Sequence, residues 1–172
     1  MSAIRFETTL FTIGSSTILL FPKPASAKLP SRGMAMVEGT INGVDAVLPL
    51  EPDGKGSHWY NVPKKLKLAA GDKVTVAVEP MKEWSEPTMP ADWKSALAAN
   101  PKILELWTEI TPMARWDWIR WIGMSKNPDT RKKHIEVALS KMKAGERRPC
   151  CFNRSMCTEP SVSKSGKLIQ PK

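Results

Sequence analysis

The first 80 residues of the chain are a succession of short apolar segments, rich in β-branched side chains and separated by turn residues. The segments are IRFETTLF, STILLFP, AMVEGTING, VDAVLPLEP, SHWYNVP and KVTVAVEP. Asn42-Gly43 stands between two of them, and such a pair is a strong signal for a two-residue β-hairpin. Residues 53–56 and 70–72 mark further turns. Short strands joined by frequent turns predict a small, closed β-barrel over residues 1–80.

A linker rich in proline and glutamate, residues 81–90, leads to a helical part at residues 91–145. Helix-start signals recur in this part, each a capping residue, a first-turn proline or both: Asp92, Pro101, Thr111-Pro112 and Asn127-Pro128. Gly145 ends the last helix. The sequence therefore predicts an α+β chain, in which an N-terminal β-barrel precedes a helical segment.

In residues 146–172 the apolar residues follow neither the helical nor the strand period, which predicts an extended basic tail. The formal net charge is +9, and twelve lysines and arginines against four aspartates and glutamates lie between Lys126 and Lys172. This asymmetry favours an anionic partner, which can be a nucleic acid, an anionic ligand or membrane surface, or an acidic protein face. The alternative is a solvated tail that keeps the protein soluble. Both a monomer and a homodimer fit the sequence.

The N-terminal segment has two interpretations. FTIGSSTILLF, followed by PASA at residues 24–27, resembles the apolar region and cleavage site of a signal peptide. Glu7 and the break at Pro22-Lys23-Pro24 argue against this, and the β-branched content favours two strands around Gly14. No segment reaches the ~20 apolar residues of a transmembrane helix. We therefore expect residues 4–21 to be barrel strands in a cytoplasmic protein that is not transmembrane.

Three spaced motifs carry a resemblance to a known family. They are V-x-G-T-I-N-G from Val37 to Gly43, G-x-G-x-H-x-x-x-V-P from Gly54 to Pro63, and G-D-x-V-x-V from Gly71 to Val76. In these motifs the chain resembles a bacterial domain family of unknown function. The resemblance implies a double-split β-barrel, related in architecture to swapped-hairpin transcription regulators and antitoxins.

The helical part carries the pattern W-I-x-x-x-K-x-P-x-T-R, formed by Trp121, Ile122, Lys126, Pro128, Thr130 and Arg131. In this pattern the chain resembles the family called bacteriocin-protection, YdeI- or OmpD-associated, which commonly occurs in one chain with the first family. The two resemblances together cover roughly residues 3 to 150. They imply a fold and a bacterial origin, but no catalytic residues.

Lys126, Thr130 and Arg131 are candidate anion ligands. They stand at the start of the last expected helix, where the first backbone amides have no partner within the helix. Lys126, these amides and Arg131 can together bind a carboxylate or a phosphate. The alternative is an internal ion pair of Arg131 that locks the helix to its neighbour, for example through Asp117.

Two further candidate ligands are His58 and Arg120. His58 lies in an expected strand, where a hydrogen-bonded structural histidine is the favoured interpretation and a ligand role the alternative. Arg120 lies among Trp116, Trp118 and Trp121, and aromatic and basic side chains together can stack the bases of single-stranded nucleic acid. Core packing of the tryptophans, with the arginines extended to water, is favoured.

All three cysteines, Cys150, Cys151 and Cys157, fall in ERRPCCFNRSMC after the last expected helix. Adjacent cysteines chelate poorly and zinc sites use C-x2-4-C pairs, so we expect no cofactor, and a metal at these thiols is not favoured. The flanking arginines favour thiolates, which makes redox chemistry an alternative to plain thiols in a tail. We expect at least one of the three thiols to react rapidly in the folded protein, and all three to be dispensable for folding.

Catalytic motifs are missing from the sequence. Neither a P-loop nor a G-x-S-x-G elbow occurs, and the two histidines form no metal motif. We therefore expect a binding or adaptor protein rather than an enzyme, linked by resemblance to stress or antimicrobial-peptide defence. The alternatives are a regulator-like nucleic-acid-binding protein and a thiol-based redox or metal-binding protein.

Overall fold

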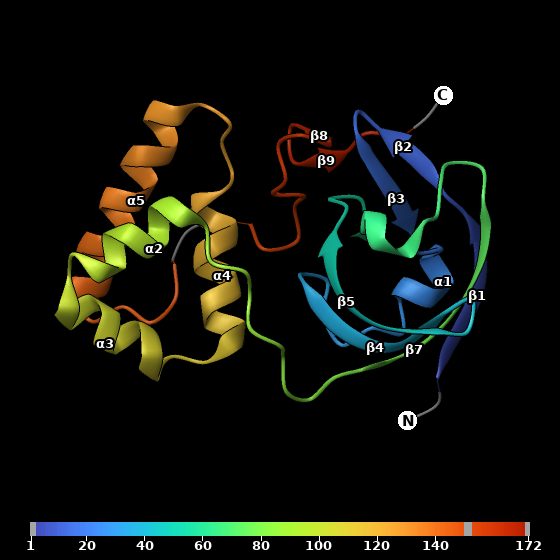
Figure 1. Ribbon diagram of the computed structural model, residues 1–172, viewed down its shortest axis with the longest axis horizontal. Coiled ribbons are helices and arrows are strands. Elements are labelled where there is room, and N and C mark those ends of the chain that lie inside the picture. The colour runs from blue at the N-terminus through green and yellow to red at the C-terminus, as the bar shows by residue number, and fades with distance from the viewer. Residues whose placement is uncertain (1–2, 150–152, 171–172) are drawn as a thin grey trace. The chain divides into compact units, whose positions relative to one another are not determined.

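The computed structural model describes residues 3–149 and 153–170, which divide into two compact units (Figure 1). The β unit comprises residues 3–82, 153–157 and 161–170, and the helical unit comprises residues 83–149 and 158–160. The chain is α+β, as the sequence predicts. No helix of the described residues has the length and apolar character that crossing a membrane requires.

The β unit contains a curled, antiparallel sheet that forms half a barrel (Figure 1). Its strand order is β1-β7-β4-β5-β6-β3-β2. The bounds are β1 Ile4–Thr9, β2 Phe11–Ile13, β3 Ser16–Leu20, β4 Ala35–Ile41, β5 Val44–Pro52, β6 His58–Asn61 and β7 Lys73–Pro80. A short helix, α1 (Lys23–Ser26), and a 3-10 turn, η1 (Lys64–Leu66), connect strands.

Alternation of side chains builds the interior of this sheet. On β7, Val74, Val76 and Val78 are buried while the residues between them face outward or are less buried, because successive strand residues point to opposite faces. The predicted hairpin at Asn42-Gly43 joins β4 to β5, and both residues have the positive φ that a two-residue turn of this kind requires, 51° and 77°.

The N-terminal segment forms three strands where the sequence predicts two. β1 pairs with β7, whereas β2 pairs with β3, so the chain changes neighbour between residues 9 and 11. Leu10 occupies this change of direction and is buried, with 2% of its surface exposed. The apolar pattern continues through Leu10 without interruption, so the sequence alone does not reveal the change of strand partner.

The helical unit consists of α2 (Ala91–Ala98), α3 (Pro101–Glu109), α4 (Pro112–Ile122) and α5 (Pro128–Lys143). The predicted cap of α4 is present, since Thr111 Oγ1 accepts a hydrogen bond from the amide of Ala114 at 3.1 Å. Pro90, rather than Asp92, precedes α2, and Asp92 lies in its first turn. The unit has its own core around Trp93, Trp107 and Trp118.

The C-terminal residues differ from the extended tail that the sequence predicts. β8 (Ser163–Lys164) and β9 (Lys167–Leu168) form a hairpin that belongs to the β unit. Cys157, Val162 and Leu168 are buried in a cluster with Ile18 and Trp59. Three apolar residues without a regular period give no secondary-structure signal, yet they supply enough buried surface to hold the segment against the sheet.

Candidate functional site

His58 is held inside the β unit by two hydrogen bonds. Its Nδ1 lies 2.5 Å from Ser26 Oγ, and its Nε2 lies 2.7 Å from the backbone oxygen of Gly33. A carbonyl oxygen only accepts, so Nε2 carries the proton and Nδ1 accepts from the Ser26 hydroxyl. Both side chains have no exposed surface. The arrangement therefore links α1 and Gly33 to β6, and a solute has no access to either side chain.

Burial controls the charge state of this histidine. It lowers the pKa of His58 below 6.5, and the positive charge of Arg32 acts in the same direction. The hydrogen bond to Gly33 and the charge of Asp53 oppose the shift, but they are outweighed. At neutral pH His58 is an uncharged structural residue, which agrees with the favoured sequence interpretation and not with a ligand role.

The three motif candidates on the helical unit do not form the expected anion site. The first amides of α5 are already used, because Asn127 Oδ1 accepts from the amides of Asp129 at 2.9 Å and Thr130 at 3.2 Å. Lys126 is exposed, and Thr130 is half-buried. The side chain of Asn127 thus takes up the backbone amides that an anion would need.

Arg131 is paired within the unit. Its Nε donates to Asp92 Oδ2 at 2.7 Å and its Nη2 donates to Asp92 Oδ1 at 3.0 Å. These bonds lower the pKa of Asp92 and raise the pKa of Arg131. The sequence interpretation of an internal ion pair is correct in kind, but the partner is Asp92 and not Asp117.

Arg120 belongs to a buried ionic network and does not extend to water. Its side chain is 4% exposed, its Nε donates to Thr158 Oγ1 at 3.3 Å, and its Nη1 lies 4.0 Å from Asp117 Oδ1. The other oxygen of Asp117 accepts from Arg148 Nη1 at 2.7 Å. A buried charge requires such partners, so this network holds α4 to Arg148 and Thr158.

The tryptophans of α4 serve the core of the helical unit. Trp118 has no exposed surface, and its indole Nε1 donates to the backbone oxygen of Arg147 at 3.0 Å. Trp121 is half-buried and stacks on His134, with ring centroids 4.6 Å apart. A base-stacking platform needs exposed rings, so the core interpretation holds for Trp118.

The cysteine cluster is only partly described. Cys150 and Cys151 lie outside the described residues. Cys157 is 2% exposed and is therefore a poor candidate for the reactive thiol that the sequence predicts, which leaves the prediction to Cys150 and Cys151. Within residues 3–149 and 153–170, no group of three histidine, cysteine, aspartate or glutamate side chains is arranged to hold a metal ion.

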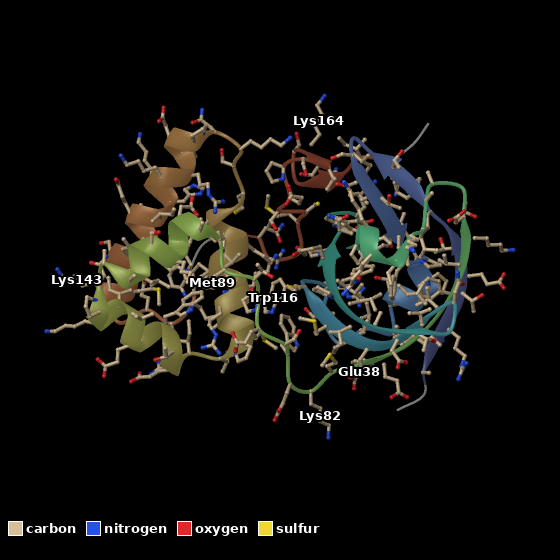
Figure 2. The ribbon with its side chains drawn as sticks, in the orientation of Figure 1. Glu38, Lys82, Met89, Trp116, Lys143 and Lys164 are labelled. Carbon is tan, nitrogen blue, oxygen red and sulfur yellow. The ribbon has the colours of Figure 1, made fainter. Side chains whose placement is uncertain are left out.

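The β unit carries a basic surface that the sequence analysis missed. We use this term for five exposed residues on four segments: Arg32, Lys55, Arg154, Lys164 and Lys167. Figure 2 shows Lys164 extending from β8 away from the protein. The glycine- and serine-rich stretches DGKGS and SKSGK are the only local signal for two of these segments, since lysines at tight turns are held at the surface.

Backbone contacts bring the four segments together. Arg32 Nη1 donates to the oxygen of Gly56 at 3.4 Å, and the amide of Leu168 donates to the oxygen of Asp53 at 2.8 Å. The amide of Cys157 donates to the oxygen of Gly166 at 2.8 Å.

Two glycines allow the closest approaches between these segments. A Cβ atom on Gly33 would lie 3.0 Å from the oxygen of Arg154, and one on Gly54 would lie 2.0 Å from the oxygen of Gly166. Each of the four segments therefore contacts two of the others, and these contacts form a closed ring.

Four cations of the basic surface, Arg32, Lys55, Lys164 and Lys167, form no ion pair among the described residues. Asp53, the carboxylate that these segments carry, is buried, and its Oδ1 accepts from the amides of Lys55 at 2.7 Å and Ser57 at 2.9 Å. Arg32 is held in place by neutral acceptors, since Nη2 donates to the backbone oxygens of Ser26 at 2.7 Å and Leu29 at 3.1 Å. The guanidinium thus keeps a fixed position and its full charge.

Folding redistributes the charge that the sequence places in the last quarter. The described residues of the β unit contain thirteen lysines and arginines against seven aspartates and glutamates, whereas those of the helical unit contain twelve against ten. Eight of the twelve basic residues of the last quarter belong to the helical unit, where acidic residues nearly balance them. The excess of positive charge lies in the β unit.

The architecture defines a two-unit chain in which a curled β sheet with a basic surface accompanies a bundle of four helices. Residues 6–78 match the family described as a domain of unknown function, DUF1905, and residues 86–145 match the family described as bacteriocin-protection, YdeI or OmpD-associated. The two matches follow one another along the chain in the two-part arrangement that the sequence motifs indicate. No curated protein matches the chain.

Proposed function

We propose that the protein is a non-enzymatic nucleic-acid-binding protein whose basic surface contacts the phosphate backbone. The observation that carries this proposal is the convergence of Arg32, Lys55, Arg154, Lys164 and Lys167 on four segments that touch one another. Neutralising several phosphates at once releases condensed counterions, which is the main source of sequence-independent affinity for nucleic acids.

The surroundings of these cations favour a nucleic acid over an acidic protein or a membrane. The four segments contribute serine, asparagine and glycine beside the cations, and such residues with their backbone amides donate to phosphate oxygens. Protein interfaces have an apolar, aromatic centre, and membrane binding uses exposed apolar side chains. On these segments Cys157 and Leu168 are buried, and Ile169, which follows Leu168, is a single exposed apolar side chain rather than part of an apolar patch.

The same surface argues against direct capture of an antimicrobial peptide. The description of the second family suggests a part in protection from bacteriocins. Membrane-active peptides are commonly rich in lysine and arginine, so the positive charges of the basic surface would repel them. A role in such defence would therefore depend on a different, anionic partner of this adaptor.

A catalytic role finds no support among the polar side chains described above. The pair with the geometry of a base and a nucleophile, His58 and Ser26, has no exposed surface. A nucleophile must reach its substrate, so this buried pair gives no support to hydrolysis.

The proposal is tested by fluorescence anisotropy with a labelled DNA duplex over a series of salt concentrations. The test variant replaces Lys55, Lys164 and Lys167 by glutamate. The matched control replaces Lys132, Lys133 and Lys143, three exposed lysines of α5, by glutamate and changes the net charge by the same amount. Both variants are first checked for folding by circular dichroism.

We expect the wild-type affinity to fall with salt, with a slope of log K on log salt of about −0.9 for each phosphate neutralised. The basic-surface variant should lose most of the affinity and of the slope, and the α5 control should retain both. Absence of binding at low salt, or equal losses in the two variants, would overturn the proposal.

A further inference from the structure

A separate hollow of the β unit has the properties of a small-ligand site. It measures about 340 Å³ and lies between the β2–β3 turn and the end of β6. Its polar lining consists of Ser15, Ser16, Thr17, Asn61 and Lys64. The volume is at the lower end of the range for ligand pockets, which corresponds to a compact solute.

The walls of this hollow are fixed by the sheet. Thr17 lies on β3, and its backbone oxygen accepts from the amide of Val62 at 2.9 Å. Asn61 ends β6 and stands opposite Ile18 of β3. Side chains that project from paired strands keep their positions better than those on loops, so the hollow is preorganised.

The polar side chains of the hollow are available to a ligand. Within the described part of the chain, Ser15, Ser16, Thr17, Asn61 and Lys64 make no side-chain hydrogen bond or ion pair. Three hydroxyls and an amide can both donate and accept, and the ammonium group of Lys64 adds a positive charge. No carboxylate lines the hollow, and Lys65 and Lys67 follow Lys64 along the chain.

Two other hollows lack this combination. In the hollow beside Met89 and Trp107, the cation Arg115 is already engaged, because its Nε donates to Glu86 Oε2 at 2.8 Å and its Nη1 to the oxygen of Ile110 at 2.7 Å. The hollow over β4 and β5 is lined by Glu38 and Asp45 and therefore repels anions. The hollow between the β2–β3 turn and β6 thus offers a cation without a carboxylate partner, Lys64, and hydroxyl groups without a hydrogen-bond partner among the described residues.

We propose that this hollow binds the phosphate monoester of a sugar. Lys64 would pair with the phosphate, and the side chains of Ser16 and Asn61, which lie on one face of the sheet because Asn61 stands opposite Ile18, would hydrogen-bond the sugar hydroxyls. The same chemistry occurs in a free sugar phosphate and in the 5′-phosphate end of a nucleic-acid strand. The site uses none of the residues of the basic surface. Its test is therefore independent of the test of nucleic-acid binding.

The test is a calorimetric titration of the full-length protein with ribose 5-phosphate, ribose and inorganic phosphate. We expect saturable binding of ribose 5-phosphate that is about tenfold tighter than binding of either fragment. Lys64→Ala and Asn61→Ala should each weaken this binding about tenfold. Lys65→Ala, which removes a neighbouring charge outside the lining, should have a much smaller effect.

A second arm distinguishes the two sources by competition with a short oligonucleotide that carries either a 5′-phosphate or a 5′-hydroxyl. Displacement of ribose 5-phosphate by the phosphorylated strand alone would assign the site to strand ends, and failure of both strands would assign it to free sugar phosphates. Three results would overturn the proposal: no saturation below about 10 mM, equal affinity for inorganic phosphate, or an equal effect of Lys65→Ala. Each can occur whether or not the basic surface binds duplex DNA.

Discussion

Arg131 and Asp92 are joined by two hydrogen bonds, Nε to Oδ2 at 2.7 Å and Nη2 to Oδ1 at 3.0 Å, although 39 residues separate them along the chain. The pair connects the first turn of α5 to the first turn of α2. The amide of Trp93 donates to the same Oδ1 at 2.8 Å, which fixes the carboxylate in place. The arginine of the W-I-x-x-x-K-x-P-x-T-R pattern thus links two helices.

Loss of this pair should have a small but measurable effect. Asp92→Asn is expected to lower the free energy of unfolding by about 0.5–1 kcal/mol, a value that already allows for screening, since the two side chains are 28% and 46% exposed. The measurement is the urea midpoint. Lys126→Ala serves as the control, because this exposed lysine makes no ion pair among the described residues and its loss should leave the midpoint unchanged.

The same variant has a pH signature. The pKa of Asp92 is lowered from 3.8, so the stabilisation by the ionised carboxylate is complete above that value and is lost as the pH falls through the folded-state pKa. Wild type and Asp92→Asn should therefore converge in strongly acidic solution. A stability difference that stays constant down to acid unfolding would contradict the assignment.

Protonation of His58 should make the stability of the protein depend on pH in less acidic solution. Its pKa is lowered below 6.5, so the unfolded chain binds the proton more readily than the folded chain. Stability should be constant above about pH 6.5 and fall below it, by at most about 1.4 kcal/mol per pH unit. His58→Gln should flatten this part of the profile, and a slope that survives the substitution would contradict the assignment to His58. Urea midpoints between about pH 5 and 8 decide between the two outcomes.

Trp118 and Trp121 should differ sharply in their contribution to stability. Trp118→Ala removes a side chain without exposed surface and is expected to cost about 3–5 kcal/mol. Trp121 is half-buried, so the same exchange there should cost less. Equal losses in a denaturant titration would mean that the two tryptophans are buried alike.

The parts of the fold that depend on short-range signals were predictable. Thr111 caps α4, Asn127 caps α5, and Asn42-Gly43 forms the turn between β4 and β5. Each cap or turn depends on residues within three positions along the chain.

The parts that depend on long-range contacts were not predictable. Asp92 and Asp117 are equally plausible partners of Arg131 in the sequence, and only the folded helices select between them. Arg32, Lys55, Arg154 and the two lysines of the C-terminal hairpin are scattered over 136 positions, from 32 to 167. Their surface exists because backbone contacts near Gly33, Gly54 and Gly166 bring the segments together.

Burial of Cys157 changes what its replacement should do. In reduced, folded protein this thiol is expected to react slowly with a thiol reagent, because it is 2% exposed and packs with Trp59 and Leu168. Cys157→Ser would bury a hydroxyl in this cluster and should cost about 1–3 kcal/mol. Rapid labelling at Cys157, identified by peptide mass spectrometry, would show that the C-terminal segment does not hold this position in solution.

Gly54 and Gly43 provide a direct test of how the C-terminal hairpin supports the basic surface. Both glycines have a φ of +77°, so an alanine at either position carries the same backbone strain. They differ in their surroundings. A Cβ atom on Gly54 would lie 2.0 Å from the backbone oxygen of Gly166, whereas one on Gly43 would have nothing within 4 Å. The difference between the two alanine variants therefore isolates the contact with the hairpin.

Gly54→Ala should be less stable than Gly43→Ala by about 1–3 kcal/mol, because a clash with backbone cannot be relieved by a side-chain rotation. It should also displace the segment that carries Lys164 and Lys167 and so weaken binding to duplex DNA, while Gly43→Ala binds as the wild type does. Urea midpoints and fluorescence anisotropy measure the two effects separately. If Gly54→Ala is destabilised but binds DNA normally, the lysines of the hairpin do not belong to the contact surface; if the two variants are equally stable, the hairpin does not pack against Gly54.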